Sequence, residues 1–354
     1  MTLPNLDGKY TSGKRRTRLF RDAPKRRAII PLSLILLGLI FLVFWIVPVY
    51  RVEPILPLKP GEISTTTPIP THTPFPTPTS AFTNYGGRIV FTCTRREVNQ
   101  ICAVNADGTG YAQITDSFHN NYYPVFTPDM TGVVFARNEG DYFDLYLLTF
   151  SGSKLTRLTK YIGNAFSPKF SPDGNQILFL NRPHDGITSL WVMGPLGEDP
   201  HPLYEGGKTI VGADWSPDGK TIAFAIAAQG YNTYEIYLLD LLDLSQPPLQ
   251  ITHSVEGVTG SLDWALDGKS LLLCMGPAGD KNLFRLDLAT GNAAQLTFGG
   301  NNASASYSPD GQFIVFNSLR KDAQADLFII RADGHSTRLL VDNPEPDWQP
   351  VWGP

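Results

Sequence analysis

Residues 170–179 read Phe-Ser-Pro-Asp-Gly-Asn-Gln-Ile-Leu-Phe, and similar phrases return along the chain. Each copy begins at an aromatic residue, here called the anchor. The other anchors are Phe126, Trp215, Trp264, Tyr307 and Trp352. Successive anchors lie about 43 to 49 residues apart, which is the period of a four-stranded propeller blade.

The phrase has the residue types of a tight turn between two strands. Proline presets the backbone at the start of the turn, aspartate bonds to nearby backbone amides, and glycine adopts a positive φ. An apolar residue follows five of the anchors at nine positions: Phe135, Phe179, Phe224, Leu273 and Phe316. This constant offset predicts a rigid hairpin, and turn chemistry explains its aspartates without a catalytic role.

Two further apolar stretches follow each hairpin. Third strands are expected around residues 145–146, 190–191, 236–237, 283–284 and 327–328, and fourth strands end near 158–159, 251–252 or 296–297. Four antiparallel strands per repeat and six repeats predict an all-β, six-bladed propeller in residues 85–354.

The repeats begin out of phase. Residues 87–91 match the second strand of a blade, and residues 347–352 match the first. We therefore expect the C-terminal strand to join the first blade and close the ring, which removes exposed sheet edges. Phe82 competes with Trp352 for this place, because it precedes Phe91 by the same nine positions, but no Pro-Asp-Gly turn follows it.

The repeat resembles the TolB-type, WD-like propeller repeat, whose consensus is close to Pro-x-Trp-Ser-Pro-Asp-Gly-x-x-Ile-x-Phe. The resemblance covers about residues 86–354. It implies the fold but not the function, because one fold hosts many functions. TolB proteins also have an N-terminal α/β domain and a cleaved signal, whereas this chain has an apolar segment and a spacer. The resemblance therefore does not imply a role in the Tol system.

The N-terminal part has the pattern of a membrane anchor. Residues 1–27 are basic, and residues 28–47 form a charge-free apolar run long enough to cross a ~30 Å hydrocarbon core. We predict a transmembrane signal-anchor helix over residues 28–50, with a basic cytoplasmic tail before it and everything after it outside. A cleavable signal peptide is the alternative, but its apolar core is usually shorter and no small-residue cleavage site follows. The adjacent apolar run also argues against a nucleic-acid arm.

Residues 51–84 are rich in proline and threonine. Such a composition cannot build a core, so the segment is predicted to be an extended linker between the membrane and the propeller.

The chain has three cysteines. Cys93 falls on the second strand of the first blade, and Cys102 replaces the aromatic residue of the third strand. A hairpin centred between Glu97 and Val98 would place the two cysteines directly opposite each other. We predict a Cys93–Cys102 disulfide, because disulfides persist in extracytoplasmic domains. Two buried thiols, as expected for Cys274, are the alternative.

Strand order sorts the loops onto two faces. The Pro-Asp-Gly turns and the third-to-fourth-strand turns share the turn face. The second-to-third-strand turns and the connections between blades share the long-loop face. Candidate residues there for binding a protein, peptide or glycan are His119, Asn121, Tyr122, Tyr123, Arg137, Asn164, Phe166, Arg182, Asn301, Asn302 and Trp348. The alternative is that asparagine serves turn geometry and arginine serves solvation.

Three charged residues stand directly before the anchors of consecutive blades, namely Lys169, Asp214 and Asp263. We expect them to line the central channel. A cation held between the carboxylates is one interpretation. A salt-bridged trio is simpler, and no metal site is predicted.

The sequence lacks the motifs of several enzyme classes. It contains no Gly-x-Ser-x-Gly nucleophile motif and no His-Glu-x-x-His zinc motif. Three Gly-Lys-Thr/Ser tripeptides lack the glycine that a P-loop requires five residues earlier. The formal net charge of −4 says little about partners.

We therefore expect a non-enzymatic binding or scaffold module without a cofactor, held outside the cell membrane by a single-pass anchor and not binding nucleic acid. A carbohydrate- or ester-processing enzyme is the alternative, with Lys169, Asp214, Asp263 and Tyr123 at the channel mouth. A sensor with the basic tail as its output is a third hypothesis, although about 27 residues are too few for an independent domain.

Overall fold

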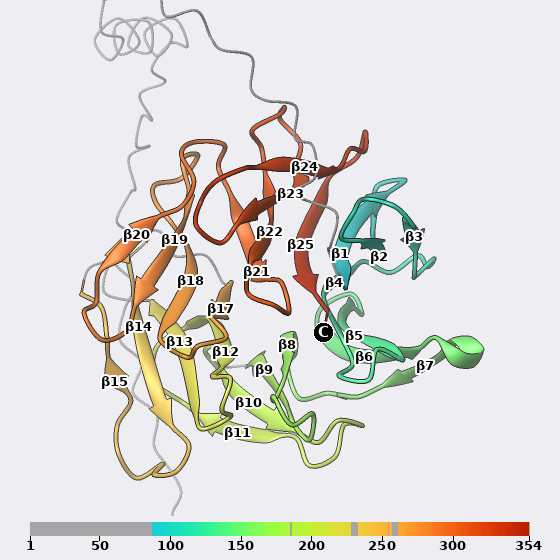
Figure 1. The fold of residues 1–354 in the computed structure, drawn as a ribbon. Helices are drawn as coiled ribbons and strands as arrows, with labels where there is room; N and C mark the ends of the chain where they lie inside the picture. Colours follow the sequence, from blue (N-terminus) through green and yellow to red (C-terminus); the bar gives the residue numbers. More distant parts are fainter. Residues whose placement is uncertain (1–86, 185, 228–232, 254, 257–260, 354) are drawn as a thin grey trace, which may run out of the picture. The chain divides into compact units, whose positions relative to one another are not determined.

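A computed structural model describes residues 87–184, 186–227, 233–253, 255–256 and 261–353. These residues form six antiparallel sheets that surround a common centre as the blades of a propeller (Figure 1). The predicted all-β, six-bladed fold is confirmed. The predicted tail, anchor and linker, residues 1–84, lie outside the described residues. Within the described part, no helix is long and apolar enough to cross a membrane.

The strands of the first three blades run from the innermost to the outermost in the following order. Blade 1 comprises β25 (Asp347–Trp352), β1 (Arg88–Arg95), β2 (Val98–Asn105) and β3 (Ala112–Gln113). Blade 2 comprises β4 (Asn121–Phe126), β5 (Gly132–Asn138), β6 (Phe143–Thr149) and β7 (Lys154–Arg157), with the 3-10 turn η1 (Ser151–Ser153) before β7. Blade 3 comprises β8 (Asn164–Phe170), β9 (Ile177–Arg182), β10 (Ser189–Met193) and β11 (His201–Tyr204).

The other three blades follow the same order. Blade 4 comprises β12 (Ile210–Trp215), β13 (Thr221–Ala227), β14 (Thr233–Asp240) and β15 (Leu249–Gln250), and β16 (Val255–Glu256) also pairs with β14. Blade 5 comprises β17 (Leu262–Trp264), β18 (Ser270–Met275), β19 (Asn282–Asp287) and β20 (Ala293–Gln295). Blade 6 comprises β21 (Ala303–Tyr307), β22 (Phe313–Ser318), β23 (Asp326–Arg331) and β24 (Arg338–Val341).

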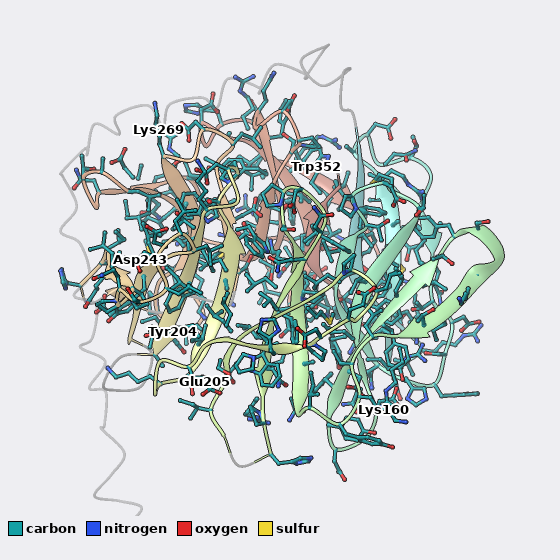
Figure 2. All side chains as sticks on the ribbon, turned by 90° about the horizontal axis from the view of Figure 1, so that it is seen from below. Lys160, Tyr204, Glu205, Asp243, Lys269 and Trp352 are labelled. Carbon is teal, nitrogen blue, oxygen red and sulfur yellow. A yellow bond between two sulfur atoms is a disulfide. The ribbon has the colours of Figure 1, made fainter. Side chains whose placement is uncertain are left out.

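The C-terminal strand closes the ring. β25 pairs antiparallel with β1, with Trp352 opposite Ile89 and Asp347 opposite Cys93. In Figure 1 the last part of the described chain lies beside the first, and Figure 2 shows Trp352 at this junction. The first strand of blade 1 therefore comes from the end of the chain, as the phase of the repeats predicts.

The core lies between the blades. Six buried apolar clusters are found in the described residues, one between each pair of neighbouring blades. The residues nine positions after the anchors are at most 1% exposed: Phe135, Phe179, Phe224, Leu273 and Phe316. Each blade thus has apolar residues on both of its faces and becomes stable only against its neighbours.

The repeated phrase forms the tight turns that it predicts. In blade 3 the Ser171 hydroxyl donates to Asp173 Oδ1 at 2.6 Å, and the Asn175 amide donates to the same oxygen at 3.1 Å. The bond from Ser171 lowers the pKa of Asp173. Gly174 adopts the required positive φ of 73°. The aspartate of the phrase is therefore committed to the turn.

Candidate functional site

A cavity of about 150 Å³ lies where the innermost strands of all six blades meet. Its lining comprises Tyr123, Pro124, Ser167, Pro168, Lys169, Ala213, Ser261, Ser304, Ala305, Gln349, Pro350 and Val351. It includes Tyr123 and Lys169, which the sequence predicts at the channel mouth and in the channel. The cavity is mainly framed by small and polar side chains, which suits a ligand that hydrogen-bonds.

Four lining residues have a backbone conformation that non-glycine residues rarely adopt. The φ angles of Tyr123, Ser167, Ser304 and Gln349 are +52°, +54°, +42° and +51°. The ladder to the neighbouring strand shifts register at each of these positions, so each residue sits in a β-bulge. This left-handed backbone conformation is energetically unfavourable for residues other than glycine, and residues that adopt it cluster at functional sites. Their convergence on one cavity marks it as the centre of the candidate site.

We call these four bulges the ring of bulges. Of their residues, the sequence-based predictions include only Tyr123. A signal for it exists, because each of the four residues stands three positions before its anchor. Ser261 occupies the same position in blade 5 and also lines the cavity, whereas blade 4 has Gly212 there. A polar residue at a constant offset within an inner strand is the pattern that would have revealed the ring.

The three predicted channel residues form a salt-bridged trio. Lys169 Nζ lies 3.6 Å from Asp214 Oδ1 and 3.3 Å from Asp263 Oδ1. Asp214 Oδ2 also accepts a hydrogen bond from the backbone amide of Trp264 at 3.1 Å, and Asp263 Oδ2 accepts one from Tyr307 at 2.7 Å. The trio thus joins blades 3 to 6 around the channel.

Burial and charge set the titration of the trio. Burial alone would lower the pKa of Lys169, but the charges of Asp214 and Asp263 have the larger combined effect. The pKa of Lys169 is therefore raised, and its amine stays protonated. Burial raises the pKa of Asp263 to about 6, against the attraction of Lys169. Among the described residues, no group of three or more His, Cys, Asp or Glu side chains is placed to hold a metal ion.

Aromatic side chains form a row beside the cavity. The rings of Tyr122 and Tyr123 are 6.4 Å apart between centroids, Tyr122 lies 5.9 Å from Phe143, and Tyr123 lies 5.8 Å from Phe166. Tyr122, Tyr123 and Phe166, which the sequence predicts as binding residues, therefore come together. Burial raises the pKa of Tyr123, so its hydroxyl keeps its proton at neutral pH and can act as a donor.

Further aromatic residues project from the long-loop face. Phe118 is 100% exposed, Phe298 80% and Tyr161 70%, and all three lie in connections between blades. Trp348, a predicted binding residue in β25, is 36% exposed. Among the aromatic side chains of the described residues that are comparably exposed, Tyr111 alone lies elsewhere, with its hydroxyl bonded to Arg95. The sequence analysis does not single out Phe118, Tyr161 or Phe298.

Two predicted binding residues, Asn121 and Asn302, form hydrogen bonds within the propeller itself. We call the residues that hold the long loops in this way the frame. Both are fully buried. The amide of Asn121 donates to Thr115 Oγ1 and to the carbonyl of His119, at 3.2 and 3.3 Å. Asn302 donates to Thr297 Oγ1 at 2.9 Å and to the carbonyl of Gly299 at 3.0 Å. Their side-chain amides are thus bonded inside the protein, because the same residue type serves a turn when its amide points inward.

Arg137 belongs to the same frame. Its Nε donates to Asn121 Oδ1 at 3.1 Å, and its guanidinium lies 4.7 Å from the centroid of the Tyr146 ring. In blade 6, Arg320 bonds to Asn302 and covers Phe316 in the same way. Such an arginine stabilises the buried asparagine and shields the core.

The remaining predicted loop residues lie on the long-loop face. Asn164 and Arg182 are opposite each other in the pair of β8 and β9, whereas His119 and Asn301 lie at other blades. His119 and Arg182 are exposed, and Asn164 and Asn301 are half-buried. His119 Nδ1 lies 3.0 Å from the carbonyl oxygen of Asn138.

A repeated threonine motif was also missed by the sequence analysis. Thr115, Thr159, Thr252 and Thr297 each accept a hydrogen bond from a backbone amide of the third strand, at 2.8 to 2.9 Å. Each also donates to a polar side chain one residue before that amide, for example Thr159 to Asp144 Oδ1 at 2.7 Å. The recurring Leu-Thr or Ile-Thr pair at the end of the fourth strand is its sequence signal.

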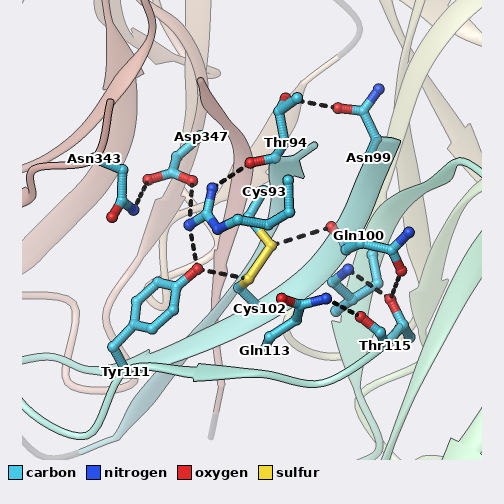
Figure 3. Close-up of a disulfide and its surroundings, with 12 residues drawn as sticks. Cys93, Thr94, Asn99, Gln100, Cys102, Tyr111, Gln113, Thr115, Asn343 and Asp347 are labelled. Carbon is cyan, nitrogen blue, oxygen red and sulfur yellow. Dashed lines mark hydrogen bonds and ion pairs between the residues drawn. A yellow bond between two sulfur atoms is a disulfide. The ribbon is translucent and has the colours of Figure 1, made fainter. Parts of the chain in front are cut away.

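Cys93 and Cys102 form a disulfide in blade 1, with their Cα atoms 5.8 Å apart (Figure 3). We expected the two cysteines directly opposite each other, but Cys93 pairs with Gln100 and Cys102 pairs with Phe91. The hairpin turns at Arg96 and Glu97, one position earlier than expected, so the disulfide joins diagonal neighbours. Cys274 is buried and is not part of this disulfide.

The profile of a known family matches most of this propeller. The family described as TolB beta propeller domain matches residues 117–241 and 188–354. The chain belongs to this family. The resemblance seen in the repeated phrase is thereby confirmed.

Three curated relatives are similar to parts of the chain. An uncharacterised protein of Agrobacterium fabrum is 31% identical over 52% of this chain and 60% of its own length. Dipeptidyl-peptidase 5 of Porphyromonas gingivalis is 26% identical over 67% of this chain and 42% of its own length. The Tol-Pal system protein TolB of Francisella tularensis is 24% identical over 64% and 54%. The chain thus spans about half the length of these relatives.

A solved structure shows the same fold. TolB from Acinetobacter baumannii has a TM-score of 0.68 to this chain at 23% identity, covering 76% of this chain and 67% of the other. This likeness concerns the propeller alone.

Proposed function

We propose that this protein is a non-enzymatic protein-binding module whose long-loop face receives its partner. The observation that carries the proposal is the exposure of Phe118, Tyr161, Phe298 and Trp348 on that face. Aromatic side chains dominate binding energy at protein interfaces. Their positions are set by loops on a rigid scaffold, the usual location of binding residues. The polar cavity at the centre of the same face offers hydrogen bonds to a segment of the partner.

The relatives support a binding role. One of them carries the name of the Tol-Pal system. Another is a peptidase, but this chain spans only 42% of that protein.

The channel carboxylates also favour binding over catalysis. Asp214 and Asp263 are each occupied by Lys169 and by a backbone amide. A general acid or base must reach the substrate proton at hydrogen-bond distance, and these oxygens already have partners. If an activity is ever detected, an Asp214→Asn and Asp263→Asn double variant that keeps it rules out the enzyme alternative for this channel.

The proposal includes attachment to the outer surface of the cell membrane through residues 28–50. The charge-free run and its basic N-terminal flank support this orientation. The Cys93–Cys102 disulfide suits an oxidising compartment. Alkaline phosphatase fused after residue 84 should be active if the orientation is right, and an inactive phosphatase with an active cytoplasmic reporter at the same position would refute it.

A comparison of two matched variants tests the binding role. The full chain is affinity-purified from membranes of its native host beside a Phe118→Ser, Tyr161→Ser, Phe298→Ser variant and a Leu242→Ser, Leu244→Ser, Leu249→Ser variant. We expect at least one co-purifying protein to be lost with the first variant and kept with the second. The proposal is refuted if every co-purifying protein is insensitive to the first variant.

A further inference from the structure

The hairpin that carries the disulfide has an unfavourable turn. Its two turn residues, Arg96 and Glu97, have φ angles of +52° and +67°. Two-residue hairpin turns with positive φ at both positions strongly prefer glycine, asparagine or aspartate. Neither residue here is of that kind, so the turn needs support from elsewhere. The disulfide between Cys93 and Cys102 closes this same hairpin.

The closing strand is attached to the same place. Cys93 lies directly opposite Asp347, the first residue of β25, and the Thr94 amide donates to the Pro346 carbonyl at 2.9 Å. β1 is therefore held between the disulfide on one side and the ring closure on the other. A change in the hairpin has a direct route to β25.

Side chains form a second connection between the disulfide and β25 (Figure 3). Cys102 Sγ lies 2.8 Å from the Tyr111 hydroxyl, which accepts a hydrogen bond from Arg95 Nη2. The same Arg95 nitrogen lies 3.4 Å from Asp347 Oδ1. The Asp347 carboxylate is fully buried, and Asn343 donates to its other oxygen at 2.7 Å. Loss of Arg95 would leave a buried carboxylate without its cation, which is strongly unfavourable.

β25 carries two residues of the candidate binding site. Trp348 is exposed on the long-loop face, and Gln349 lines the central cavity. Gln349 Oε1 accepts hydrogen bonds from Thr92 Oγ1 at 2.8 Å and from the Tyr123 amide at 3.0 Å. The start of β25 thus joins the disulfide region to the site.

We propose that the Cys93–Cys102 disulfide is a redox-sensitive latch that holds the start of β25 in place and so positions Trp348 and Gln349. The latch stands on the contacts above, and its effect on partner binding rests on the protein-binding function proposed in the previous section.

An open cavity lies beside the hairpin that holds this bond. Both cysteines are fully buried, but a cavity of about 650 Å³ beside the hairpin is lined by Arg95, Gln100 and Gln113. Gln100 pairs with Cys93, and Gln113 pairs with Cys102. A small dithiol donates two electrons and two protons, which leaves thiols on Cys93 and Cys102 and oxidises the dithiol to its own disulfide. The turn can then relax, and Arg95 can leave Asp347.

Hydrogen exchange of the full chain tests the latch without any partner. Amide exchange is compared between the oxidised protein and protein treated with a dithiol. We expect exchange at residues 347–349 to become at least ten times faster on reduction, while exchange in β13 of blade 4 stays the same. Unchanged exchange at residues 347–349, or an equal increase in β13, would overturn the proposal.

Variants make the test specific. The dithiol should have no effect on a Cys93→Ser, Cys102→Ser protein and its full effect on a Cys274→Ser protein, which keeps the disulfide. An Arg95→Gln variant should show fast exchange at residues 347–349 even when oxidised. Slow exchange in oxidised Arg95→Gln would contradict the side-chain route from the hairpin to Asp347.

Partner binding is then measured separately with the protein identified by affinity purification. Weaker binding to the reduced chain supports the link between the latch and the site. Unchanged binding together with faster exchange would keep the latch and refute its role in binding. Failure to find a face-dependent partner refutes the proposed function but leaves the exchange result valid.

Discussion

The two faces of the propeller are built from the same repeat but differ in their exposed apolar residues. The exposed large apolar residues of the turn face are mainly leucines, with Tyr111 besides: Leu196, Leu242, Leu244, Leu249 and Leu266. Those of the long-loop face are mainly aromatic, with Ile187 besides: Phe118, Tyr161, Phe298 and Trp348. On the turn face, side chains such as Ser171 and Asp173 are engaged in the turns themselves. The fold explains the polar residues of the turn face, whereas it does not explain the exposed aromatic residues opposite.

The largest expected effect concerns partner affinity. Replacing Phe118, Tyr161 and Phe298 by serine should weaken binding at least about 100-fold, or about 2.7 kcal/mol, because aromatic hot spots carry much of the energy of an interface. The partner affinity of the Leu242→Ser, Leu244→Ser, Leu249→Ser control should stay within about twofold of that of the unchanged protein. Titration of the identified partner by calorimetry measures both. Equal losses would remove the distinction between the faces.

A second prediction separates frame from surface within the long-loop face. Asn121→Ala should lower the free energy of unfolding by about 2–3 kcal/mol, because the buried Thr115 and the half-buried Arg137 each lose a hydrogen bond. His119→Ala, at an exposed position two residues earlier, should change it by less than about 0.5 kcal/mol. Urea unfolding measures both values. A small effect of Asn121→Ala would contradict its role in the frame.

The fold was predictable because its signals are local and repeated. The turn phrase and the apolar residue nine positions later mark each hairpin, and the phase of residues 87–91 marks the missing strand that β25 supplies. The register of the first hairpin was not predictable. Its turn places Arg96 and Glu97 at positive φ, which intrinsic preferences argue against.

The site was less predictable, for a physical reason. Asn121 and Asn302 have the residue type of exposed loops, and only the packing reveals that their amides point inward. The ring of bulges depends on backbone conformation, which polar residue types do not specify. In contrast, Lys169, Asp214 and Asp263 form the expected trio, because their position before the anchors fixes the side of the strand on which they lie.

A third prediction concerns the channel between the faces. The pKa of Asp263 is raised to about 6, so the folded protein binds its proton more tightly than the unfolded chain does. Stability from this group therefore falls as pH rises from about 4 to about 6 and is regained on acidification. Asp263→Asn should remove about 1–2 kcal/mol of this pH dependence. Urea unfolding between pH 4 and pH 8 tests it, and an identical profile in the variant would contradict the assignment.

The smallest expected effect compares one glycine on each face. Gly174 in a Pro-Asp-Gly turn has φ +73°, and an added Cβ would lie 3.1 Å from Pro128 Cγ. Gly207 in a blade connection has φ +67° but open space around it. Both alanine variants carry the strain of a positive φ, but only Gly174→Ala also brings a Cβ close to another side chain. Gly174→Ala should therefore be less stable than Gly207→Ala by about 1 kcal/mol. Thermal unfolding measures the difference, and equal stability would show that the turn face tolerates the added atom.

The central claim is that the long-loop face contacts a protein partner, and site-specific photo-crosslinking tests it most directly. A photoreactive phenylalanine analogue replaces Phe118 or Phe298 on the long-loop face, and Leu242 or Leu249 on the turn face, in the full chain in living cells. We predict that the same protein is crosslinked from Phe118 and Phe298 and from neither leucine position. Crosslinks to one protein from the leucine positions, with none from Phe118 or Phe298, would contradict the claim.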